Sequence, residues 1–275
     1  MNVTIAIPTF NRSRYIDKAI ESVLEQTYQD FELLVIDNAS TDNTEDVVHS
    51  FVDKRIRYVK NEKNIGIIGN WNKCVQLSSG KYLTILGDDD ILSKRFLKES
   101  MAVHNSHPTV GFTFAHCNKV DETGNFIKRW GYDFTPAGLI EGLDYLFYTL
   151  DYEACLTNSS TVLLKKEVFN SLEGFRIEFA RNVFDFNMWI RIASLYDIFF
   201  INEVLCDYRI HDNQVSQLHW REKKTGKVGT YLELFNIISI LQEKGYELKK
   251  DYVISKLRSL TKNLSEFLLA FDSEL

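Results

Sequence analysis

Short apolar runs alternate with helical patterns from Val3 to Ala115, and this alternation constrains the fold more than any other feature. The runs Val3–Ile7, Phe31–Ile36 and Tyr82–Leu86 are mostly apolar, as expected for parallel strands that are buried on both faces. Between them, apolar residues recur at helical spacing, for example over Tyr15–Leu24. The alternation predicts an α/β sandwich with a mostly parallel central sheet.

Composition limits the classes of partner and of metal site. The chain has 275 residues, of which 45% are hydrophobic, so it can bury a sizeable core. The formal net charge is −6 and no basic stripe is present, which argues against nucleic acid as a partner. The four cysteines are far apart in sequence and form no CxxC pair, so we expect free thiols and no structural zinc.

A change of composition after His219 suggests two units. Beyond it, two Lys/Glu-rich amphipathic segments predict helices, and the apolar stripe of the first is expected to be a packing face. That stripe comprises Leu234, Ile237, Ile238 and Leu241. We predict a domain at 1–217, with a nucleotide-binding half at 1–118 and an acceptor-side half at 119–217, followed by a helical appendage at 218–275.

The sequence shows neither the pattern of a signal peptide nor that of a membrane-spanning helix. No charged region followed by an apolar one precedes Val3, so we expect no signal peptide. The most apolar run, Ile198–Leu205, is too short to span a bilayer. We therefore expect a cytoplasmic protein. Its C-terminal helices leave open peripheral contact with the inner face of the membrane and assembly into a homodimer.

Polar residues that form turns follow three of the predicted strands. They are Pro8–Arg12, Asp37–Asp42 and Gly87–Asp90. Because ligands of open parallel sheets bind outside the carboxyl ends of the strands, a site is expected at this edge.

Each polar segment has a functional and a structural interpretation. The adjacent carboxylates Asp88–Asp90 repel one another and suit Mg²⁺ or Mn²⁺, but they are also compatible with a solvated helix N-terminus. In the second segment, Ser40, Thr41 and Asp42 are good helix caps, whereas Asp37 ends a buried strand and is available to a nucleobase. The glycines fit neither a dinucleotide-binding fingerprint nor a phosphate-binding loop.

Four segments together resemble glycosyltransferase family 2, a family of inverting enzymes with the GT-A fold. They are Ile7–Arg12, Ile36–Asp42, Asn64–Gly66 and Leu86–Asp90, in the family's order and each at a strand end or loop. The resemblance extends over roughly the first 215 residues. It implies a GT-A type sandwich to which the C-terminal helices are added.

The resemblance also implies roles for individual residues. The implied nucleotide-binding residues are Pro8, Thr9, Asn11, Asp37, Asn64 and Asp88. Asp89 would be the main ligand of a Mn²⁺ or Mg²⁺ cofactor, and His211 would approach that metal, although a lone histidine is also often a packed residue. The sequence departs from the commonest family pattern at Gly87, where the first acid of the metal motif usually stands.

Asp185 is implied to be the catalytic base. It precedes an apolar helical pattern that contains Trp189, which is expected to be core rather than a platform for a sugar. The alternative role of Asp185 is to cap that helix.

The implied function is transfer of a sugar from a UDP- or dTDP-sugar to a hydroxyl of a saccharide or lipid-linked acceptor, in bacterial polysaccharide or glycolipid synthesis. A loop near Asp121–Gly142, or the segment after His211, would close over the donor. Two other classes stay open. A sugar nucleotidyltransferase normally has a glycine-rich loop after its first strand, and Ile7–Ile16 contains no glycine. A non-catalytic sugar-nucleotide-binding or scaffold protein would not need Asp185.

Overall fold

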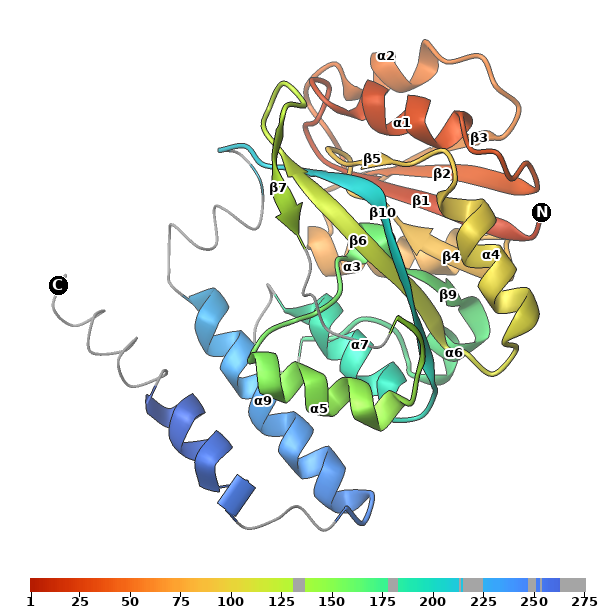
Figure 1. The fold of residues 1–275 in the computed structure, drawn as a ribbon. Coiled ribbons are helices and arrows are strands. Elements are labelled where there is room, and N and C mark those ends of the chain that lie inside the picture. Colours follow the sequence, from red (N-terminus) through yellow and green to blue (C-terminus); the bar gives the residue numbers. More distant parts are fainter. Residues whose placement is uncertain are drawn as a thin grey trace, which may run out of the picture.

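Ten strands form one mixed sheet in the part of the chain that the computed structural model describes, which is residues 1–130, 137–177, 183–212, 214, 225–246, 251–252 and 254–262 (Figure 1). The strand order is β3-β2-β1-β4-β9-β6-β10-β5, with β7 paired to β6 and β8 paired to β10. The strands are β1 (Val3–Thr9), β2 (Phe31–Asp37), β3 (Ile56–Lys60), β4 (Tyr82–Ile85), β5 (Ile91–Leu92), β6 (Phe112–Val120), β7 (Phe126–Trp130), β8 (Gly138–Ile140), β9 (Leu163–Lys165) and β10 (Ile198–Arg209).

The predicted parallel sheet is confirmed in the first part of the chain. Strand β1 pairs in parallel with both β2 and β4, and β2 pairs in parallel with β3. In this register Thr9 lies beside Asp37, so the segments that follow both strands emerge at the same edge. The three longest pairings of the sheet are all parallel. Shorter strands join the sheet through antiparallel pairings, and one of them, β9, lies between β4 and β6.

Helices cover both faces of the sheet, as an α/β sandwich requires (Figure 1). The helices are α1 (Ile16–Leu24), α2 (Thr44–His49), α3 (Gly66–Leu77), α4 (Phe96–Ser106), α5 (Gly142–Tyr152), α6 (Lys166–Ser171), α7 (Phe184–Ala193) and α9 (Thr225–Glu243), with a 3₁₀ turn η1 (Ser159–Thr161). Alternate residues of β1 enter two apolar cores. Ile5 and Ile7 pack in a core with α1 and α4, whereas Ala6 packs in a core with α3, α5 and α7.

Some expected boundaries differ from the structure. The apolar pattern predicts two strands, Ile198–Ile201 and Leu205–Tyr208, but the structure has one strand, β10, whose register against β6 shifts between Ile201 and Cys206. The apolar pattern predicts a helix over Trp71–Leu77, but α3 already begins at Gly66, which takes a positive φ of 79° that favours glycine. The region Asp121–Gly142, for which the glycine and proline pattern predicts loop and hairpin, contains the turn and second strand of the hairpin β6–β7, and 131–136 of that region lie outside the described residues.

The apolar stripe of α9 is buried, as predicted. Leu234, Ile237 and Leu241 have no exposed surface and belong to the core that contains α5 and α7. A polar contact adds to this packing, because Asn187 Nδ2 of α7 donates to Glu233 Oε1 of α9 at 3.0 Å. The division into units at 217 stays a prediction. None of the described helices is long and apolar enough to cross a bilayer.

The packing of α9 predicts that Leu234→Ala lowers the free energy of unfolding by about 3 kcal/mol, because the change leaves a cavity in a core. Leu195→Ala is a matched control, since Leu195 is 54% exposed and Leu234 is 0% exposed. We expect the control to change the free energy by less than about 0.5 kcal/mol. Urea unfolding followed by circular dichroism measures both. Equal losses in the two variants would contradict burial of α9 in this core.

Candidate functional site

A cavity of about 1060 Å³ opens at the edge of the sheet where β1, β2 and β4 end. Seven of the predicted site residues line it: Pro8, Thr9, Asn11, Asn64, Asp88, Asp89 and Asp185. Asp37 and His211 are not part of the lining, although His211 contacts Asp89. The structure therefore brings the four motif segments and the candidate base together around one space.

Asp37 holds the turn that follows β2. Its side chain is fully buried. Oδ1 accepts a hydrogen bond from Ser40 N at 2.7 Å and Oδ2 accepts one from Tyr58 Oη at 2.6 Å. The role of Asp37 in contacting the base stays a prediction. The next residue, Asn38, lines the cavity and was not singled out from the sequence.

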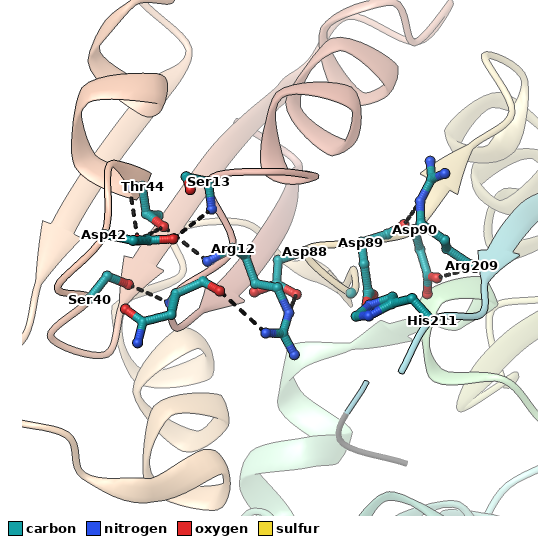
Figure 2. A network of polar contacts seen from close by, with 12 residues as sticks. Arg12, Ser13, Ser40, Asp42, Thr44, Asp88, Asp89, Asp90, Arg209 and His211 are labelled. Atoms are coloured by element: carbon teal, nitrogen blue, oxygen red, sulfur yellow. Dashed lines mark hydrogen bonds and ion pairs between the residues drawn. The ribbon is translucent and has the colours of Figure 1, made fainter. Parts of the chain in front are cut away.

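The segments after β1 and β2 are tied together by hydrogen bonds (Figure 2). Asn11 N donates to Ser40 Oγ at 2.9 Å, and Thr41 N donates to Asn11 Oδ1 at 2.8 Å. Asp42 accepts hydrogen bonds from Ser13 N at 3.0 Å and from Thr44 N at 3.1 Å. The N-cap of α2 is Asn43, so Ser40, Thr41 and Asp42 do not occupy the predicted cap position and instead join the two strand ends.

A network of amides fixes the orientation of Asn64. Asn38 Nδ2 donates to Asn64 Oδ1 at 2.9 Å, and Gly66 N donates to the same oxygen at 2.8 Å. Asn38 Oδ1 in turn accepts hydrogen bonds from Asn61 Nδ2 and from Ile65 N. With its oxygen bonded twice, Asn64 has its amide Nδ2 available as a donor for a ligand of the cavity.

The turn at Gly87 leaves little room for a side chain at that position. Asp90 N donates to Gly87 O at 3.1 Å, which closes the turn. A Cβ added at Gly87 would lie 2.9 Å from Asp90 Oδ2 and 3.1 Å from Asp89 Oδ1. A side chain there would crowd both carboxylates, so the departure from the family pattern accompanies a tight turn.

The three adjacent carboxylates turn to different partners (Figure 2). Asp88 Oδ1 lies 3.5 Å from Arg12 Nε, and Asp89 Oδ2 lies 2.8 Å from His211 Nε2. Asp90 accepts hydrogen bonds from Ser160 Oγ at 2.6 Å and from Arg209 N at 3.1 Å. Asp89 and Asp90 are 8% and 2% exposed, and the turn leads into β5. The alternative of a solvated helix N-terminus is therefore wrong.

Burial and mutual repulsion raise the pKa of two of these groups. Burial, with repulsion from Asp89, raises the pKa of Asp88 to about 7, although Arg12 opposes the shift. The same two causes raise the pKa of Asp90 well above its ordinary value. A cation near this turn is therefore electrostatically favourable.

The end of β10 packs against the acidic turn. Arg209 Nε donates to Asp89 O at 3.0 Å, and the His211 ring lies 4.6 Å from the Tyr15 ring. In the described part of the chain, His211 Nδ1 has no hydrogen-bond partner, and no three His, Cys, Asp or Glu side chains converge as a metal centre. Asp89 and His211 thus offer two neighbouring donors, and their role as metal ligands stays a prediction.

Asp185 lies in the first turn of α7 and is half-buried in the cavity wall. Oδ1 accepts a hydrogen bond from Phe186 N at 2.8 Å, and Oδ2 accepts one from Ser159 Oγ at 2.7 Å. The N-cap residue is Val183, so Asp185 is not the cap, although it satisfies one N–H of the first turn. Burial raises the pKa of Asp185. Trp189, which is 2% exposed, belongs to the core as predicted.

Two serines of η1 connect the candidate base to the acidic turn, and sequence reasoning missed both. Ser159 bonds Asp185, whereas Ser160 bonds Asp90 and also accepts a hydrogen bond from Gly87 N. They lie about 70 residues from the acidic turn, and β9 brings them there by pairing with β4. No local pattern in the sequence signals this contact.

Residues 4–163 match the model of the family described as Glycosyl transferase family 2. An uncharacterised glycosyltransferase of Methanocaldococcus jannaschii is 29% identical, over 81% of this chain and 80% of the relative. The Escherichia coli protein WfgD, named as a UDP-Glc:alpha-D-GlcNAc-diphosphoundecaprenol beta-1,3-glucosyltransferase, is 28% identical over 81% of this chain and 82% of the relative. TuaG of Bacillus subtilis, named as a putative teichuronic acid biosynthesis glycosyltransferase, is 24% identical over 81% of this chain and 84% of the relative.

Solved structures share the fold. Residues 1–349 of Staphylococcus aureus TarS, in complex with UDP-GlcNAc, superpose with a TM-score of 0.70 at 17% identity, covering 95% of this chain and 72% of TarS 1–349. This likeness confirms the GT-A type sandwich that the motifs implied. With the four motif segments around one cavity and a family model that matches most of the chain, the protein belongs to glycosyltransferase family 2.

Proposed function

We propose that the protein is an inverting glycosyltransferase that moves a sugar from a UDP- or dTDP-sugar to a hydroxyl of a saccharide or lipid-linked acceptor. The setting that we propose is the synthesis of a bacterial surface polysaccharide or glycolipid. Membership of the family supports the enzyme class, and the names of WfgD and TuaG support the setting.

One observation carries the proposal: the strand-end segments and the carboxylate of Asp185 line the same cavity. A nucleotide bound at the ends of β1, β2 and β4 would direct its sugar toward the remaining part of this space. An acceptor hydroxyl near Asp185 could then attack the anomeric carbon directly, which requires no covalent intermediate on the protein.

We place the base of the nucleotide sugar in the pocket formed by Thr9, Asn11 and Asn64. The amide Nδ2 of Asn64 can donate a hydrogen bond to a carbonyl oxygen of uracil or thymine, because the hydrogen bonds to Asn64 Oδ1 fix the orientation of the amide. Asp88, which lies next to Arg12, is the proposed contact for the ribose. Complexes of TarS, whose fold this chain shares, with UDP-GlcNAc and with UDP support the choice of a uracil nucleotide.

Asp89 and His211 fit a Mn²⁺ or Mg²⁺ cofactor. A carboxylate and an imidazole 2.8 Å apart can face one ion, and such ions commonly complete their shell with water and substrate phosphates. A bound ion would neutralise the charge that develops on the leaving diphosphate. A mannosyltransferase from Pyrobaculum calidifontis, which has a similar structure, was solved in complex with GDP-Man and Mn²⁺.

In the proposed mechanism, side chains of the protein accept the proton and hold the base in place. Asp185 takes the proton from the acceptor hydroxyl, and its raised pKa makes it a stronger base than an exposed aspartate. Ser159 holds the carboxylate in place by donating to Oδ2. Since Ser160 donates to Asp90, the same turn fixes Asp185 relative to the acidic segment.

Donor hydrolysis and binding test this function directly. Wild type and Asp185→Asn are assayed with UDP-, dTDP- and GDP-sugars in Mn²⁺, Mg²⁺ or EDTA. We expect metal-dependent release of UDP or dTDP by the wild type, and a loss of about a hundredfold or more in the variant, because general-base catalysis contributes on that order. Donor affinity of Asp185→Asn should stay within about twofold of wild type, since uncharged Asn is of equal size.

Two outcomes would contradict the proposal. Absence of binding to every nucleotide sugar, with and without metal, would exclude the transferase and any sugar-nucleotide-binding role. Equal release by wild type and Asp185→Asn would remove Asp185 as the base.

The hydrogen bond from Ser159 predicts a shift of the pH profile. The ionised form of Asp185 is the active base, so kcat/KM falls as the pH falls through its folded-state pKa. The Ser159 hydroxyl lowers this pKa, because it stabilises the charged form. Ser159→Ala should therefore move the acid limb of the profile to higher pH. Ser171→Ala on α6 is a matched control, and an acid limb that stays in place in Ser159→Ala would contradict the assignment.

A further inference from the structure

Three residues of the cavity lining come from strands that do not pair with β1 or β2. Lys119 lies on β6, Trp130 on β7 and Tyr208 on β10, and these strands run side by side (Figure 1). In the sheet order, β6 and β10 are separated from β1 and β2 by β4 and β9. Because Tyr208 precedes Arg209, whose N donates to Asp90, this wall lies beside the acidic turn rather than beside the ends of β1 and β2.

The register places these side chains on one face of the sheet. Lys119 pairs with Lys128 across β6–β7 and with Tyr208 across β6–β10. Trp130 pairs with Cys117, which is two residues from Lys119 on the same strand. Residues that pair directly, and residues two apart, point to the same face. Two lysines and two aromatic side chains thus share this face.

The positive charge of this wall has no acidic partner in the described part of the chain. Neither Lys119 nor Lys128 forms an ion pair there, and like charges directly opposite each other on paired strands are unfavourable. The nearby acids are engaged elsewhere. Asp121 accepts hydrogen bonds from Thr123 and Asn125, and Glu122 pairs with Arg14 at 3.1 Å.

Lys119 is the more buried of the two lysines. Its side chain is half-buried, and burial, together with repulsion from Lys128, lowers its pKa. Lys119 Nζ lies 5.1 Å from the centre of the Trp130 ring, and the Trp130 and Tyr208 rings lie 5.3 Å apart. The two rings are tilted by 38° and form an apolar surface beside a cation, which matches a sugar ring that carries a negative group.

We propose that Lys119, Trp130 and Tyr208 form an acceptor subsite that binds an anionic group, a phosphate or a carboxylate, next to a sugar ring. The rings pack on the sugar, and Lys119 pairs with the anion. This inference rests on the proposed transferase function and narrows its acceptor class to anionic saccharides.

Binding of three acceptor mimics tests the subsite, with saturating UDP and Mn²⁺ present so that the nucleotide region is occupied. The mimics are octyl glucoside, octyl glucuronide and an octyl diphosphate of N-acetylglucosamine, titrated by calorimetry. At least one anionic mimic should bind about tenfold more tightly than the neutral one, which corresponds to about 1.4 kcal/mol. Preference for the diphosphate or for the glucuronide then identifies the anion as phosphate or carboxylate.

Variants of Lys119 test whether the preference for an anionic mimic depends on its charge or is lost through general damage to the site. Lys119→Gln should remove the preference, and Lys119→Arg should keep it. Lys98→Gln, on the exposed face of α4, is the matched control and should behave as wild type.

The outcomes distinguish this inference from the proposed function. Equal or undetectable binding of all three mimics by a protein that binds UDP overturns the subsite alone. Loss of UDP affinity in Lys119→Gln also overturns it, because Lys119 would then serve the donor diphosphate. Failure of the wild type to bind any nucleotide sugar removes the function on which the subsite rests.

Discussion

The repulsion among three carboxylates in one buried turn is the constraint on which the site depends. Asp88, Asp89 and Asp90 follow a buried strand, and two of them are less than a tenth exposed. Charges in such a place require partners, because burial without them is strongly unfavourable. Arg12 from the β1 loop, His211 after β10 and Ser160 of η1 provide them. Segments distant in sequence are therefore drawn to the end of β4.

The same partners arrange the cavity. Because Ser160 is bonded to Asp90 and its neighbour Ser159 is bonded to Asp185, one short turn sets the candidate base relative to the acidic segment. The insertion of β9 between β4 and β6 makes this possible, since η1 leads directly into β9. The core beneath, which includes α7 and the buried face of α9, supports the helix that presents Asp185.

Local patterns in the sequence were sufficient for the first strands of the sheet and for the edge where they end. The apolar runs predicted β1, β2 and β4, and the polar turns after them predicted the edge at which the cavity lies. Contacts between distant segments could not be predicted in this way. The pairing of β9 with β4, the bond between Ser159 and Asp185, and the pairing of Lys119 with Lys128 all depend on sheet order. Apolar periodicity predicts strands but not their neighbours. The bulged strand β10 was divided in two for a related reason, because Asn202 and Glu203 interrupt its apolar pattern.

The stereochemistry of transfer tests the central claim most directly. If Asp185 activates an acceptor hydroxyl for one direct displacement in this cavity, the new glycosidic bond must have the anomeric configuration opposite to that of the donor. Proton NMR of the product formed from the identified donor, with its anomeric proton followed from the start of the reaction, measures this. We predict inversion as the first-formed product. Retention would contradict a single displacement with Asp185 as base.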